Sequence, residues 1–237
     1  MKPIILAITF LTRLPMPRID AGSDEYASAI RWFPLAGLAV GLAIAVAAWI
    51  GQRPDPWGGA LCALLAWAII TGALHLDGLG DIADAAAAAH GDRERVSAVL
   101  ADPHIGSFGV AAIALQLIAK LVLLRLVLEQ APAWSLILIP ALARIGPLVW
   151  SLLLPPLHEG MGTSFRAGAN WAAVVLWLLV LGAGALCAVP TLLIGLLAIP
   201  AWAVWLRHRI GGISGDGHGA GIELVESALL AAWVFLG

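Results

Sequence analysis

Asp77, Asp81 and Asp84 stand in the segment HLDGLGDIADA, at the end of an apolar stretch long enough to cross a bilayer. In a helix, these spacings of four and three residues place all three carboxylates within an arc of about 60°. Clustered carboxylates repel one another unless a cation sits among them, and hard oxygen atoms suit Mg²⁺, Mn²⁺ or Ca²⁺. The segment therefore predicts a catalytic metal site with these aspartates as ligands. The alternative is a solvated helix end, where capping and the helix dipole favour aspartate.

A second acidic group lies in the segment GGISGDGHGAGIELVE, which holds Asp216, Glu223 and Glu226. Its glycines predict a flexible loop before a helix, where backbone N–H groups at Gly215 and Gly217 could bind phosphate oxygens. Glu223 and Glu226 are three residues apart and share a helical face, at the edge of hydrocarbon where carboxylates are costly and usually functional. We predict Asp216 as a catalytic residue and the two glutamates as metal ligands. The alternative is an acidic first helical turn favoured by the helix dipole.

Three cationic residues, Lys120, Arg125 and Arg144, fall inside apolar stretches and should face a polar interior. Arginine suits bidentate contacts with phosphate, and Arg144, near the middle of its stretch, is the strongest candidate for that role. The alternatives are pairing with Glu129 or another acid, and snorkelling to an interface.

His75 precedes the three aspartates and could act as a base, an acid or a ligand. Helical spacing nevertheless turns its side chain away from the aspartate face. We keep it as a candidate catalytic residue.

The composition excludes an ordinary soluble domain. The chain is 61% hydrophobic and 12% charged, against about 25% charged residues in soluble domains. It has no polar stretch long enough for a separate globular unit, so residues 1–237 form one membrane-embedded domain. No basic run with interleaved aromatic residues supports nucleic-acid binding. We expect an all-α, polytopic bundle of membrane helices in contact with lipid.

Spans of about 17–25 apolar residues predict the number of crossings. The stretch 171–206 is too long for one span, and Pro190 at its middle predicts two short helices joined by a tight turn. Seven spans result: 33–50, 57–74, 105–128, 132–154, the two halves of 171–206, and 222–236. Before them, residues 1–17 predict a short interfacial helix closed by Pro15 and Pro17.

The distribution of lysine and arginine predicts the orientation. With a cytoplasmic N-terminus, the outside segments hold Arg53 and the inside segments hold all the other loop cations. These inside residues are Lys2, Arg13, Arg18, Arg31, Arg93, Arg95, Arg166, Arg207 and Arg209. Both acidic segments then face the cytoplasm, and if they bind the same diphosphate, the helix ends that carry them must be neighbours.

Five segments, in order along the chain, resemble the landmarks of the cobalamin synthase family, the adenosylcobinamide-GDP ribazoletransferases. They are FLTRLPMP, RWFPLAGLAVG, HLDGLGDIADA, DPHIGSFG and GGISGDGHGAGIELVE, and together they cover nearly the whole chain. The resemblance implies a late step of vitamin B12 synthesis at the cytoplasmic (inner) membrane. In that step α-ribazole or its 5′-phosphate joins adenosylcobinamide-GDP, GMP is released, and Mg²⁺ is the cofactor.

The resemblance also implies roles for individual residues. The three aspartates of HLDGLGDIADA would hold Mg²⁺ on the diphosphate, and the second acidic group would hold another ion or accept a proton. Three arginines are candidates for substrate and phosphate binding: Arg13, Arg31 and Arg144. The possible protein partners are a second copy of the chain, in a homo-oligomer, and other enzymes of cobalamin synthesis.

Two other classes of protein use acidic residues on membrane helices. One is a different diphosphate enzyme, such as a CDP-alcohol phosphotransferase or a prenyltransferase, although the D-G-x-x-A-R opening of the former is missing. The other is a small cation transporter, which predicts acids at mid-membrane depth rather than at one edge.

Overall fold

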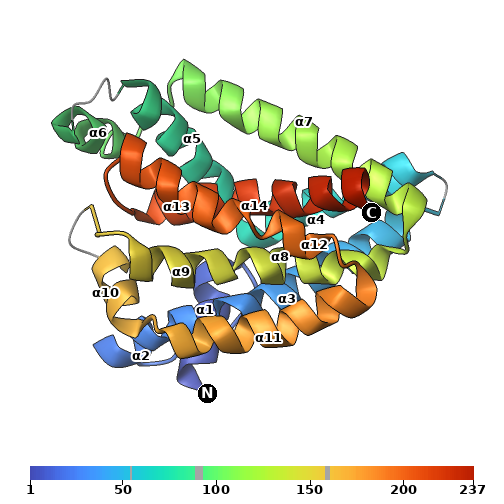
Figure 1. Ribbon diagram of the computed structural model, residues 1–237, viewed down its shortest axis with the longest axis horizontal. Coiled ribbons are helices and arrows are strands. Elements are labelled where there is room, and N and C mark those ends of the chain that lie inside the picture. Colours follow the sequence, from blue (N-terminus) through green and yellow to red (C-terminus); the bar gives the residue numbers. More distant parts are fainter. Residues whose placement is uncertain (54, 89–92, 158–160) are drawn as a thin grey trace.

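The computed structural model describes residues 1–53, 55–88, 93–157 and 161–237, in which helices joined by loops are present and strands are absent (Figure 1). The first half comprises α1 (Lys2–Leu11), α2 (Ser23–Ala29), η1 (Ile30–Trp32), α3 (Phe33–Gly51), α4 (Pro56–Thr71), α5 (Leu74–Ala88), α6 (Arg93–Leu100) and α7 (Ser107–Gln130). The second half comprises η2 (Ala133–Ile137), α8 (Leu138–Ala143), α9 (Ile145–Leu153), α10 (Met161–Gly168), α11 (Trp171–Ala188), α12 (Leu192–Gly195), α13 (Ala198–Arg209) and α14 (Gly215–Leu236). The predicted all-α class is confirmed.

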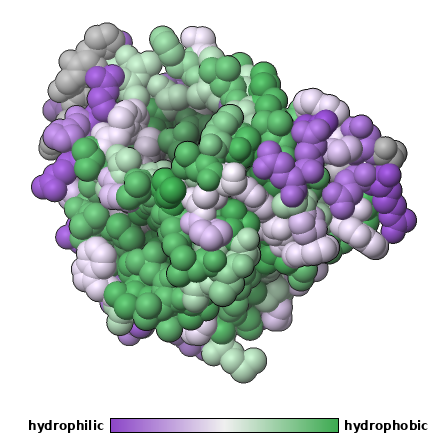
Figure 2. Space-filling model, turned by 45° about the vertical axis from the view of Figure 1, so that its right-hand side comes forward, coloured by the Kyte–Doolittle hydropathy of each residue, from purple (hydrophilic) through white to green (hydrophobic). Residues whose placement is uncertain are grey.

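Six helical stretches in the described residues are long and apolar enough to cross a membrane, and the bent pair α4–α5 supplies a seventh if it is counted as one span. These helices run roughly side by side along the long axis of the molecule (Figure 1). Apolar residues cover much of the face seen in Figure 2, and hydrophilic residues gather towards two sides of that face. The chain is therefore a multi-pass membrane protein, as the span count predicted.

The long apolar stretch 171–206 is divided as predicted. Helix α11 ends at Ala188, Pro190 lies in the connection, and α12 begins at Leu192. The N-terminal helix is also confirmed: α1 ends at Leu11, before Pro15 and Pro17. Its residues Leu6, Ala7 and Leu11 are buried against the bundle.

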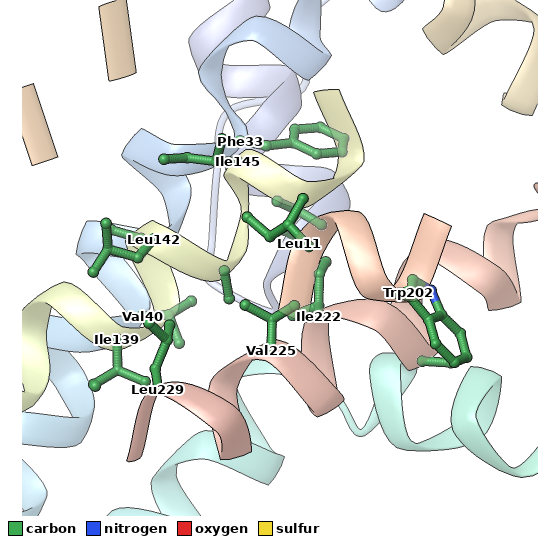
Figure 3. Close-up of a cluster of buried hydrophobic side chains, with 14 of the residues drawn as sticks. Leu11, Phe33, Val40, Ile139, Leu142, Ile145, Trp202, Ile222, Val225 and Leu229 are labelled. Atoms are coloured by element: carbon green, nitrogen blue, oxygen red, sulfur yellow. The ribbon is translucent and has the colours of Figure 1, made fainter. Parts of the chain in front are cut away.

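Helix α14 lies at the centre of the bundle and packs against α5, α7, α8, α9, α12 and α13. Ile222, Val225 and Leu229 on α14 point into a cluster that also contains Leu11 and Ile145 (Figure 3). Hydrocarbon tails are as apolar as these side chains, so close packing rather than removal from water holds such helices together.

Helix α14 begins seven residues earlier than the predicted span 222–236, and the predicted glycine loop forms its first two turns. Ser214 caps this helix, its Oγ accepting a hydrogen bond of 3.0 Å from the N–H of Gly217. A Cβ atom on Gly219 would lie 3.2 Å from the Cα of His75, so the glycine lets α14 approach the start of α5. Tertiary packing thus outweighs the low helix propensity of glycine.

Helix α4 also differs from its predicted span 57–74, because it ends at Thr71 and the chain then bends by 84° into α5. Gly72 and Ala73 both adopt the left-handed backbone conformation, with φ of 61° and 56°. Glycine takes this conformation without steric cost, whereas alanine does not. The bend carries the aspartate segment across α14 instead of continuing along α4.

Candidate functional site

The crossing of α5 and α14 brings the two acidic segments together. A Cβ atom on Gly78 would lie 2.8 Å from both the Cα and the carbonyl oxygen of Asp216, so backbone touches backbone at this point. The carboxylate of Asp81 is repelled by those of Asp216, Asp77 and Asp84. The prediction that the two acidic segments are neighbours is therefore confirmed for Asp216.

Asp84 fixes α5 to the beginning of α7. Its two carboxylate oxygens accept hydrogen bonds from the backbone N–H groups of Gly106, at 2.7 Å, and Gly109, at 3.0 Å. A carboxylate is favoured there by the N–H groups that no helical carbonyl satisfies. In the loop before α7, hydrogen bonds from the His104 side chain and backbone N–H lower the pKa of Asp102. The segment DPHIGSFG thus anchors the acidic helix.

Asp77 is the most accessible member of the cluster, because it is exposed whereas Asp81 and Asp84 are half-buried, and both oxygens of Asp84 already accept hydrogen bonds. Within the described ranges, no group of three or more His, Cys, Asp or Glu side chains is already arranged to hold a metal ion. The donor set nevertheless fits Mg²⁺: it consists of carboxylate oxygens, and the charges that act on Asp81 are those of other carboxylates. Metal binding by Asp77, Asp81 and Asp84 stays a prediction.

Glu223 and Glu226 belong to a different set of contacts, buried inside the bundle. Lys120 donates to both carboxylates, and its Nζ lies 2.7 Å from Glu223 Oε2. Glu223 also accepts a hydrogen bond of 3.0 Å from the side-chain amide of Gln116. Glu226 accepts hydrogen bonds from the guanidinium of Arg144 and, at 3.3 Å, from Trp67 Nε1. The cationic side chains of Lys120 and Arg144 therefore lie beside these glutamates, where metal ions were predicted. We leave Glu223 and Glu226 out of the proposed metal ligands.

Arg144 is fully buried and takes part in this network, which matches the ion-pairing alternative rather than phosphate binding. Besides Glu226, its guanidinium donates to the carbonyl oxygen of Pro140, at 3.1 Å. A second guanidinium nitrogen lies 3.3 Å from His75 Nδ1. Arg144 thus connects the buried glutamates to the first turn of α5.

The two other predicted phosphate-binding arginines lie in different places. The backbone N–H of Arg13 donates to the carbonyl oxygen of Ile70 at 2.7 Å, and its exposed side chain passes over Gly72 at the α4–α5 bend. It lines a cavity of about 600 Å³ beside the start of α5. Arg31 instead donates through Nε to the carbonyl oxygen of Gly168, at 2.6 Å, at the end of α10. Arg13 is therefore the better placed of the two for a substrate at α5.

A smaller cavity of about 140 Å³ lies beside the acids, and its lining includes His75, Asp77, Gly215, Asp216 and His218. Helical spacing predicted that the His75 side chain points away from the aspartates. His75 and Asp77 nevertheless line the same cavity, because α5 packs against α14. Gly215 is exposed at the first position of α14, whereas the N–H of Gly217 is taken by the capping serine.

Sequence reasoning gave no role to the aromatic and second histidine side chains of this cavity, which are those of Phe10, Phe33, Phe165 and His218. The first two fall in the landmark segments FLTRLPMP and RWFPLAGLAVG, and His218 falls in the glycine-rich segment. Their places in these segments could have marked them as candidate site residues. That they line one cavity could not be predicted, because it depends on packing between helices far apart in sequence.

The fold and the site define a class: a multi-pass helical membrane protein with an acidic centre where two helices cross. A family model described as cobalamin-5-phosphate synthase matches residues 3–234, and the chain belongs to this cobalamin synthase family. No solved structure matches the chain.

Curated relatives resemble the chain over almost its full length. A protein of Novosphingobium aromaticivorans is 50% identical, covering 100% of this chain and 98% of its own length. One of Thiobacillus denitrificans is 50% identical, covering 97% and 94%, and one of Laribacter hongkongensis is 47% identical, covering 97% and 95%. All three are named adenosylcobinamide-GDP ribazoletransferase.

Proposed function

We propose that the protein is an adenosylcobinamide-GDP ribazoletransferase, a membrane transferase of late cobalamin synthesis. Its substrates are adenosylcobinamide-GDP and α-ribazole or its 5′-phosphate, and GMP is released. Family membership over residues 3–234 supports this assignment. The structural observation that carries it is the contact between Gly78 and Asp216, because it joins the two acidic segments into one centre.

The reaction needs a base that accepts the proton of the attacking hydroxyl group, and we assign this role to Asp216. A ribazole hydroxyl oxygen bonds to the phosphorus attached to cobinamide, the P–O bond to the GMP oxygen breaks, and GMP leaves with the bonding electron pair. The hydroxyl proton passes to the base. Glu223 and Glu226 are held by Lys120 and Arg144, whereas Asp216 borders the cavity beside Asp77.

Mg²⁺ is the proposed cofactor, and Asp77 and Asp81 would hold it with help from Asp84. When bound, such an ion neutralises charge on the diphosphate and on the departing GMP. Asp84 also fixes the helix that carries the other two acids, through its hydrogen bonds to Gly106 and Gly109.

We propose that the site faces the cytoplasm from the inner membrane. In support, Arg209 at the end of α13 contacts the carbonyl oxygen of Ala86 at 3.5 Å, so a cationic helix end lies beside α5. Basic residues accumulate on the cytoplasmic side of membrane proteins. Reporter fusions after Ala101 and Gly212 should report a cytoplasmic position, and a fusion at Gly237 the opposite side. A cytoplasmic signal from Gly237 would contradict this orientation.

The proposed function is tested with purified protein in lipid nanodiscs, Mg²⁺, adenosylcobinamide-GDP and α-ribazole 5′-phosphate. We expect GMP and the joined corrinoid to form in equal amounts. Parallel reactions with a CDP-alcohol and with a prenyl diphosphate should give no product. Transfer from either of these in place of the corrinoid would refute the assignment.

A further inference from the structure

The smaller cavity beside the acids has a lining of two kinds of chemistry. One part is aromatic: the rings of Phe10 and Phe33 stack with centroids 5.8 Å apart, and Phe165 meets both edge-on, at 5.2 and 5.3 Å. The lining also includes Asp77 and Asp216, which are acidic. A ligand with a flat apolar part and a polar part suits such a space.

Two buried histidine nitrogen atoms in this cavity have no hydrogen-bond partner among the residues described. They are His75 Nε2 and His218 Nδ1, on side chains that belong to residues 2% and 7% exposed. An unsatisfied buried polar atom costs about 1–3 kcal/mol, so such atoms usually indicate a missing partner. Both atoms belong to residues that line the same cavity.

The contact with Arg144 determines which hydrogen-bonding role His75 Nε2 plays. Arginine can donate hydrogen bonds but cannot accept them, so Nδ1 of His75, 3.3 Å from the guanidinium, must be the acceptor. The ring proton then resides on Nε2. His75, which lines the cavity, therefore carries an unpartnered donor, and the matching ligand atom is an acceptor.

We propose that this cavity binds the aromatic base of the ribazole nucleoside, with His75 Nε2–H donating to the unsubstituted ring nitrogen of that base. The inference rests on the proposed function and identifies where its second substrate sits. The volume of about 140 Å³ admits one ring of a planar aromatic group, since an apolar cavity of about 150 Å³ holds benzene. The sugar of a base seated there extends towards Asp77 and Asp216, where its hydroxyl reacts.

The neighbouring cavity of about 600 Å³ shares Phe10, Leu74 and Phe165 with the smaller one. This shared wall separates a narrow compartment from a wide one that contains Arg13. The wide compartment therefore leaves room for part of the larger substrate while the nucleoside base occupies the small cavity.

The first test is direct binding to wild-type protein in detergent, by calorimetry and without corrinoid. The probes are α-ribazole and the corresponding indole nucleoside, in which a C–H group replaces the ring nitrogen. We expect the indole nucleoside to bind roughly 10- to 100-fold more weakly, because it leaves the histidine donor unpaired. Equal dissociation constants would overturn the inference even if GMP release proceeds normally. Nitrogen-dependent binding without GMP release would support the cavity assignment and overturn the proposed function.

The second test separates substrate binding from catalysis at His75. The variant His75→Ala should raise KM for α-ribazole roughly 10- to 100-fold, leave KM for the corrinoid substrate unchanged, and lose the preference over the indole nucleoside. His75→Gln, which keeps an N–H donor, should recover part of that preference, and His208→Ala, an exposed histidine on α13, should behave as wild type. A fall in kcat with unchanged KM would make His75 a catalytic residue instead. Since the wild-type comparison needs no variant, it decides the matter even if His75→Ala does not fold.

Discussion

Replacing Gly78 by alanine is expected to separate α5 from α14 at the acidic centre. The added Cβ would lie 2.8 Å from the Cα of Asp216, whereas carbon atoms in contact normally stay about 3.5 Å apart or more. The obstacle is backbone, which no rotamer change can move, so the helices must part by roughly 0.7 Å. Overpacking of this kind costs about 1–3 kcal/mol of folding stability, partly offset by about 0.5–1 kcal/mol from the better helix propensity of alanine.

The effect on catalysis should exceed the effect on stability. A displacement of about 1 Å between catalytic groups can lower a rate about 10²-fold, and Asp216 would move relative to Asp77 and Asp81. We would measure GMP release and thermal unfolding in the same detergent. Gly182→Ala on α11 is the matched control, because its Cβ would meet nothing nearer than a Leu193 side-chain atom at 3.8 Å. Wild-type turnover in the Gly78→Ala variant would refute the view that this helix contact builds the site.

Three further substitutions separate the acidic centre from the buried network. Asp77→Asn and Asp81→Asn should each lower turnover at least about 100-fold while the unfolding temperature stays within a few degrees of wild type; full activity in either variant would remove that residue from the centre. Glu226→Leu should destabilise the protein by about 3–5 kcal/mol in denaturant titrations, because Lys120 and Arg144 lose a buried counter-charge. Unchanged stability of Glu226→Leu, relative to the exposed control Glu129→Gln, would contradict that role.

The sequence predicted the helical class, the span count and the break at Pro190, because these depend on apolar run length and on proline, which are local properties. It also predicted that the aspartate segment and Asp216 share one centre. The start of α14 could not be predicted in this way, since glycine propensity favours a loop. Contact with the backbone of His75 reverses that preference, and such contacts exist only in the folded bundle.

The partners of the charged residues were the least predictable part of the site. Glu223, Glu226 and Arg144 have the residue types of metal and phosphate ligands, and spacing alone does not reveal a neutralising partner on another helix. Lys120 is 103 residues away from Glu223 along the chain, yet their side chains meet inside the bundle. Ion pairing was the open alternative for Arg144, and the three-dimensional arrangement favours it.

Mn²⁺ binding, followed by electron paramagnetic resonance in the presence of adenosylcobinamide-GDP, tests most directly which acids form the centre. Mn²⁺ is a suitable probe because it takes the same oxygen ligands as Mg²⁺. We predict saturable binding to the wild type, loss of that binding in the double variant Asp77→Asn with Asp81→Asn, and its retention in Glu223→Gln. Binding that survives the double aspartate substitution, or that disappears in Glu223→Gln, would contradict the acidic centre described here.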